Sequence, residues 1–154
     1  MAIRVREDGG KDMTCSVEDL VGQAPRHINL EERVRKARGR AFDLRSWYAV
    51  WAGEGQGEGE GADGPTHLIV EAEDEFQAII PWHELDMASI LYEQDGKPLQ
   101  KGFPIRLYVP NGSSACLNVK SVVDIRFARD KQLGEAATYG YKNEVTLEQL
   151  RYKG

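Results

Sequence analysis

Residues 90–110 read ILYEQDGKPLQKGFPIRLYVP, and this stretch decides how the chain folds. Two runs rich in β-branched and aromatic residues, Ile90–Glu93 and Ile105–Val109, indicate strands. Asp95-Gly96 between them supplies turn chemistry, because both residue types tolerate left-handed backbone. Pro98 fixes an extended entry, and Pro104 sets up the second strand, which holds Arg106 at a defined place.

Further strand signals lie on both sides of this stretch. His67–Glu71 and Phe76–Ile80 are short β-prone runs whose spacing suits a hairpin, and Pro81 then opens a turn of helix. Val119–Phe127 reads as another strand. From Lys131 to Asn143 we expect loop, followed by a short helix that Thr146 caps. The pattern predicts an α+β fold with a β-rich, mixed but mostly antiparallel sheet and short flanking helices.

One helix is well marked before the strands. Leu44, Trp47, Tyr48 and Trp51 fall on one helical face, with Asp43 as N-cap and Gly53 as stop. Aromatic residues at this spacing favour a buried core face over a cofactor box.

The segments before this helix give weaker signals. Residues 1–28 are polar and of uncertain order, although Ser16 could cap a short helix over Val17–Val21. Asn29 and Glu32 have the spacing of a capping box, and the basic run Arg33–Arg40 that follows has no apolar stripe. We therefore expect a solvated helix face there, with an anion-binding or nucleic-acid surface as the alternative.

Composition excludes several classes of protein. The 154 residues suit a single domain, and 41% hydrophobic with 29% charged residues is typical of a soluble globular chain. A net charge of -5 argues against nucleic acid as a partner. The N-terminus shows no export signal or membrane span, which favours a cytoplasmic protein, and Cys15 and Cys116 would remain thiols there. Residues 53–64 alternate glycine with acidic residues and predict a flexible surface loop, not a phosphate-binding loop.

Common catalytic patterns are absent from the sequence. His27, His67 and His83 occur singly, so no zinc site is expected, and no metal ligand is assigned. His83-Glu84 could serve acid/base chemistry, although an ordinary surface histidine is the simpler interpretation. There is no Gly-x-Ser-x-Gly elbow to activate a serine.

The quoted stretch resembles a signature of the sulfite oxidase family. There the pattern is Tyr-Glu-x-Asn-Gly-x-Pro-Leu followed by His-Gly-x-Pro-x-Arg-Leu-x-Val-Pro, and residues 92–99 and 101–110 match most positions in order. Residues 74–81 resemble the preceding strand, and residues 119–122 resemble the Val-Lys-Trp step that follows. The resemblance extends over residues 39–127 and implies a sulfite-oxidase-type molybdopterin-binding fold in a truncated, divergent member.

By this resemblance, Arg106 and Lys120 contact the anionic pterin cofactor. Lys101 is the third cofactor contact that the resemblance implies: it stands where the family has histidine and keeps positive charge without the imidazole. Ser121 stands where the family has tryptophan. The family holds molybdenum through a cysteine thiolate, and the neighbours of Cys15 do not match that loop.

The resemblance thus implies a molybdopterin-type cofactor-binding domain related to oxidoreductases, with its catalytic competence left open. The alternative is a noncatalytic scaffold or protein-interaction domain that kept the fold and lost the cofactor.

Overall fold

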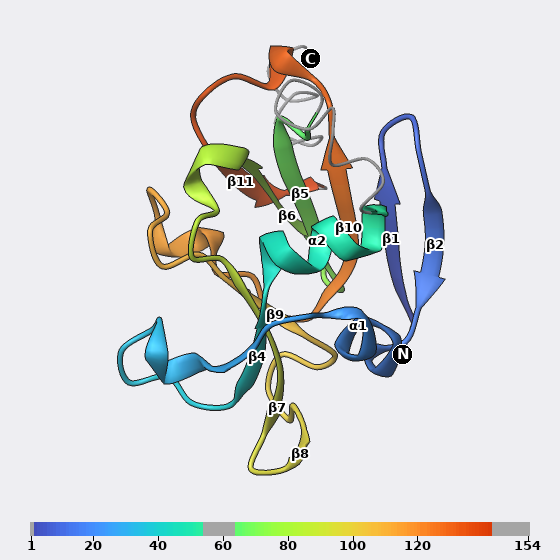
Figure 1. Ribbon diagram of the computed structural model, residues 1–154. Coiled ribbons are helices and arrows are strands. Elements are labelled where there is room, and N and C mark those ends of the chain that lie inside the picture. The colour runs from blue at the N-terminus through green and yellow to red at the C-terminus, as the bar shows by residue number, and fades with distance from the viewer. Residues whose placement is uncertain (1, 54–63, 143–154) are drawn as a thin grey trace.

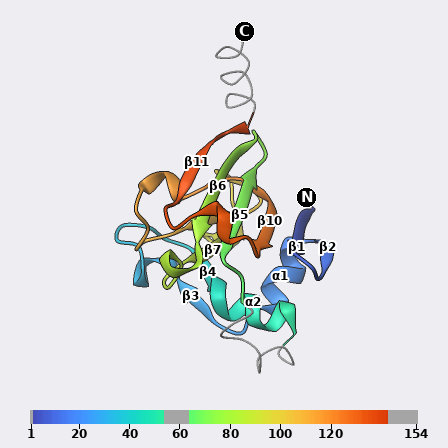
Figure 2. The ribbon, with the colours of Figure 1, turned by 90° about the horizontal axis from the view of Figure 1, so that it is seen from above.

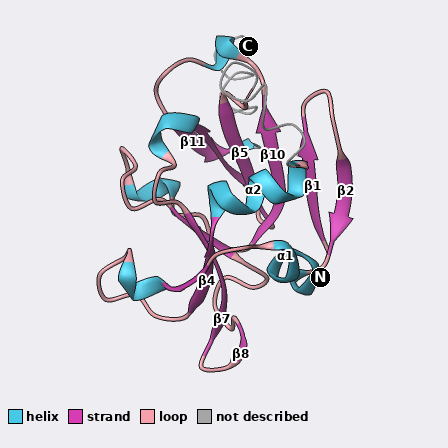
Figure 3. Ribbon diagram, viewed as in Figure 1, coloured by secondary structure: helices cyan, strands magenta, loops and turns pink. Residues whose placement is uncertain are grey.

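The computed structural model describes residues 2–53 and 64–142, and within them two β-sheets pack with two α-helices (Figures 1 and 3). The fold is α+β and rich in strand, as the sequence predicts. The larger sheet has six strands in the order β11-β6-β5-β10-β1-β2. Its members are β1 (Ile3–Glu7), β2 (Asp12–Cys15), β5 (His67–Ala72), β6 (Phe76–Pro81), β10 (Val122–Ala128) and β11 (Thr138–Tyr141).

The second sheet has five strands and carries the quoted stretch. Its order is β3-β4-β7-β8, and β9 pairs with β7 beside β8. Its members are β3 (His27–Asn29), β4 (Arg40–Asp43), β7 (Ser89–Gln94), β8 (Lys97–Pro98) and β9 (Arg106–Tyr108).

Short helices join the strands. They are α1 (Val17–Gln23), α2 (Leu44–Ala52) and single 3-10 turns at Leu30–Glu32, Trp82–Glu84, Ala115–Leu117 and Lys131–Leu133.

Most strand pairs are antiparallel, as predicted. Within the described part of the chain, β1 and β10 form the one parallel pair, with Val5 opposite Ile125. Seen from above, the hairpin of β1 and β2 lies at one end of the larger sheet and β11 at the other (Figure 2). The sequence predicted one mixed sheet, whereas the structure divides the strands between two.

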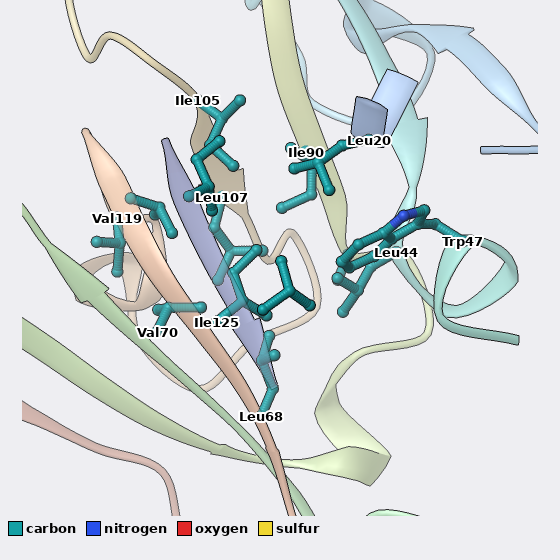
Figure 4. Packing of buried hydrophobic residues seen from close by; sticks show 14 of the residues in the cluster. Leu20, Leu44, Trp47, Leu68, Val70, Ile90, Ile105, Leu107, Val119 and Ile125 are labelled. Carbon is teal, nitrogen blue, oxygen red and sulfur yellow. The ribbon is translucent and has the colours of Figure 1, made fainter. Parts of the chain in front are cut away.

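The predicted aromatic helix forms as α2 and joins the two sheets. Asp43 caps it by accepting a hydrogen bond from the Ser46 backbone N–H at 2.9 Å, and Gly53 ends it with a φ of 97°. Trp47 is fully buried and its ring lies 5.8 Å from that of Phe127 in β10. Figure 4 shows Trp47 and Leu44 among side chains that come from both sheets. The helical stripe is therefore core, as the sequence indicated.

The quoted stretch folds as expected around its Asp-Gly turn. Asp95 and Gly96 both have positive φ, at 56° and 74°, which closes the hairpin of β7 and β8. The chain then returns so that β9 runs antiparallel to β7, with Arg106 opposite Leu91. Gly102, just before this return, has a φ of 83°.

The prediction of a solvated helix over Arg33–Arg40 is wrong. The chain forms a single 3-10 turn at Leu30–Glu32, and the Arg33 side chain is 4% exposed. Its guanidinium lies 2.8 Å from the Asp43 carboxylate, so a buried ion pair replaces the expected solvation. Periodicity did not reveal this arrangement because the carboxylate comes from another strand.

Two terminal segments also differ from expectation. Residues of uncertain order at the N-terminus form β1, β2 and α1, with Ser16 capping α1 as predicted. The expected loop after Lys131 contains β11, which pairs with β6. The predicted mobile loop lies largely in residues 54–63, outside the described residues. The predicted helix after Thr146 lies outside them too.

Candidate functional site

The three predicted cofactor contacts belong to one region of the surface. Leu107 and Val119 exchange backbone hydrogen bonds of 2.8 and 3.0 Å, which makes them a hydrogen-bonded antiparallel pair. Arg106 precedes Leu107 and Lys120 follows Val119, so the two residues flank this backbone pair. Leu107 and Val119 are buried, whereas Arg106 is half-buried and Lys120 is exposed.

Gly102 connects Lys101 to this pair. The Ser121 backbone N–H donates to the Gly102 carbonyl at 3.2 Å, so residues 101–102 lie beside residues 120–121. The Arg106 side chain lies against Gly102, where a β-carbon would collide with its Cγ and Cδ atoms. These backbone contacts make Lys101, Arg106 and Lys120 neighbours in the fold, and we call the three residues the cation cluster.

The side chains of the cation cluster form no ion pairs among the described residues. Within residues 2–53 and 64–142, none of its three members forms an ion pair or a hydrogen bond through its side chain. The Arg106 guanidinium instead lies 5.1 Å from the centre of the Tyr108 ring, in cation–π contact. Neighbouring like charges repel each other, so an anion bound by Arg106 and Lys120 would stabilise the arrangement.

Two hollows lie next to the cation cluster. The smaller, of about 230 Å³, is lined by Lys120 together with Asp74, Cys116 and Tyr141. The larger, of about 580 Å³, is lined by Phe103 from the segment between Lys101 and Arg106. Neither hollow is lined by Arg106 or Lys101. The three cations therefore share a surface region without sharing the walls of either hollow.

Cys15 does not suit a metal-binding thiolate. It ends β2 and is 4% exposed within the main core cluster. Burial, with a smaller contribution from Asp19, raises the pKa of its thiol, which therefore stays protonated near neutral pH. A soft metal requires the deprotonated sulfur.

Cys116 has a different environment that the sequence did not indicate. It is exposed on the 3-10 turn Ala115–Leu117 and lines the same hollow as Lys120. In the sequence, Cys116 follows the family motif, and the return of the chain after β9 brings Cys116 to the hollow that Lys120 lines. Among the described residues, no group of three or more His, Cys, Asp or Glu side chains is arranged to hold a metal ion.

The histidines serve structural contacts. His67 is buried, with its two ring nitrogens 2.7 Å from Thr66 Oγ1 and from the Gly134 carbonyl oxygen. His27 Nδ1 lies 2.8 Å from the Tyr92 hydroxyl. His83 is exposed, and its Nε2 atom lies 3.3 Å from the Glu135 carbonyl oxygen. No acid/base pair of His83 with Glu84 is seen among these contacts, since Glu84 accepts from Ser113.

Within the described residues, none of the helices has the length and apolar character needed to span a membrane.

Comparisons with known proteins add no relative. No protein-family model matches the chain, and neither a curated protein nor a solved structure does. Membership of the sulfite oxidase family therefore stays a prediction from the motif in residues 90–110.

Proposed function

We propose that this protein binds an anionic, phosphate-bearing cofactor of the molybdopterin type through the cation cluster. The proposal is supported by backbone contacts that make Arg106, Lys120 and Lys101 neighbours, and by the lack of an ion pair at any of the three among the described residues. An arginine guanidinium can bind two phosphate oxygens at once, and lysine adds a compact charge. Among anionic ligands we choose the pterin because residues 90–110 resemble the sulfite oxidase motif.

The residues fit one part of such a cofactor better than another. Three cations fit the phosphate group, whose charge needs compensation. The Cys15 thiol does not fit the metal, because it is 4% exposed and lines neither hollow. Bound molybdopterin would supply redox chemistry through its metal, and the roles of this chain's residues are to bind and orient the phosphate. We assign no catalytic residue and no redox step.

Purification from a molybdenum-replete host tests the proposal. The purified protein is expected to contain pterin, which is measured by the fluorescence of its oxidised form after denaturation, while molybdenum is measured by mass spectrometry. Arg106→Gln and Lys120→Gln should each lower the pterin content, because each removes one charge from the phosphate site.

Lys131→Gln is the matched control, since Lys131 is also an exposed lysine and lies beyond the far end of β10 from Lys120. It should retain the wild-type pterin content. Wild-type protein without pterin would contradict the proposal and leave the noncatalytic interaction domain as the better account.

A further inference from the structure

The larger hollow lies between the N-terminal helix and the quoted stretch. It has a volume of about 580 Å³ and is bounded by α1, the β7–β8 hairpin and the segment at Phe103. This volume lies in the range of small-ligand pockets, roughly 300 to 1,000 Å³. Much of the wall is apolar, from Val17 and Val21 on α1 to Phe103 and Pro104 opposite. Phe103 is 39% exposed, so an accessible aromatic residue is part of the wall.

The charge of this hollow is opposite to that of the cation cluster. Its charged lining residues are Glu18 on α1 and Glu93 on β7, and no Lys or Arg of the described chain lines it. Neither carboxylate forms an ion pair or side-chain hydrogen bond within residues 2–53 and 64–142. Arg40 stands opposite Glu93 in the β4–β7 register, and its guanidinium interacts with Asn29 Oδ1 at 3.2 Å and with the Tyr92 side chain.

The second aromatic wall is Tyr92, whose ring is held in place. Its hydroxyl lies 2.8 Å from His27 Nδ1, and the two rings meet edge to face at 5.7 Å. Aromatic faces attract cations, and two carboxylates that form no ion pair among the described residues strengthen that attraction.

The geometry points to a binding site for a small organic cation, an amine carried on an apolar or aromatic body. The body would lie against Val17, Val21 and Phe103, and the ammonium would lie near Glu18 and Glu93. This site is separate from the proposed anion site, because none of the three cations lines the hollow.

Three matched probes test the charge requirement: 3-phenylpropylamine, 3-phenylpropanol and 3-phenylpropionate share one apolar body and differ in charge. Each is titrated into full-length, ¹⁵N-labelled protein, and amide shift changes give the Kd and the location. The amine is expected to bind about five- to tenfold more tightly than the alcohol, with the propionate weaker than both. The shifts should concentrate at residues 16–22, 92–93 and 103.

Variants separate the two contributions. Glu18→Gln combined with Glu93→Gln should remove the preference for amine over alcohol, whereas Phe103→Ala should weaken both probes. Glu31→Gln is the control, because Glu31 is exposed and does not line the hollow. Equal binding of all three probes, shifts elsewhere, or no binding of the amine would overturn the inference. So would binding of a basic peptide without binding of the amine, which would make the hollow a peptide site.

Discussion

Replacing Arg33 by methionine should lower the free energy of unfolding far more than replacing an exposed arginine of the same basic run. The Arg33 side chain is 4% exposed, and its Nη1 atom lies 2.8 Å from Asp43 Oδ1. The same atom lies 3.1 Å from Ser89 Oγ and 3.3 Å from the carbonyl oxygens of Met87 and Ala88. Methionine fills a similar volume without charge, so the substitution tests the ion pair and not the packing.

The cost of Arg33→Met should concentrate on Asp43. The Ala88 carbonyl still accepts from the Leu44 N–H, and the Met87 carbonyl still accepts from Ser89 Oγ. The Asp43 side chain, 9% exposed, would keep the Ser46 N–H but lose its opposite charge. Removing one partner of a buried pair costs about 3–5 kcal/mol of unfolding free energy, and we expect the lower part of that range here.

Urea unfolding followed by tryptophan fluorescence measures this cost. Arg38→Met is the control, because the Arg38–Asp95 pair is exposed on both sides and should contribute less than about 1 kcal/mol. The double variant Arg33→Met/Asp43→Asn should be more stable than Arg33→Met, since it leaves no buried charge without a partner. A loss below about 1 kcal/mol for Arg33→Met, or a double variant less stable than the single one, would refute the reasoning.

Three further predictions concern the site, the core and pH. Gly102→Ala should lower pterin content as Arg106→Gln does, because a β-carbon there meets the Arg106 stem and a φ of 83° is strained; unchanged content would contradict this. Trp47→Ala should cost about 3–5 kcal/mol in urea unfolding, and a loss under about 1 kcal/mol would argue against its burial. The pKa of Asp8 is lowered chiefly by the hydrogen bond from Arg126. Burial raises the pKa of Asp43, but hydrogen bonds from Ser46 and Arg33 together outweigh burial and lower it. Because both pKa values are depressed in the folded state, the two carboxylates stabilise the fold above a pH of about 3.9. The free energy of unfolding should therefore fall as the pH is lowered through the folded-state pKa values. Equal unfolding free energies at neutral pH and near pH 3 would contradict the assignment.

Local signals in the sequence predicted local structure well. The helix from Asp43 to Gly53 forms because a capping side chain, an aromatic stripe and a glycine stop lie within one short segment. The Asp95-Gly96 turn forms for the same kind of reason, since its backbone preference depends on those two residues.

Pairings between distant segments were not predictable from periodicity. The parallel pairing of β1 with β10 joins residues 3–7 to residues 122–128, and the sequence of neither segment indicates its pairing partner. The burial of Arg33 depends likewise on a carboxylate that another strand supplies. Strand β11 is short and mostly exposed, so it shows little of the alternation that marks a half-buried strand.

The candidate sites divide in the same way. Arg106 and Lys120 were found by motif, and the backbone pairing at Leu107 and Val119 gives their grouping a geometric basis. The sequence did not reveal the acidic hollow, because Glu18 on α1 is far in the sequence from Glu93 and Phe103, which line the same hollow. Val17 and Val21, four residues apart on a short helix, were the available hint of an apolar face there.

A crystal structure of the protein with bound molybdopterin would test the central claim most directly. We expect the phosphate oxygens to lie within hydrogen-bonding distance of the Arg106 guanidinium and the Lys120 ammonium. Pterin bound elsewhere, with these two side chains in solvent, would contradict the account.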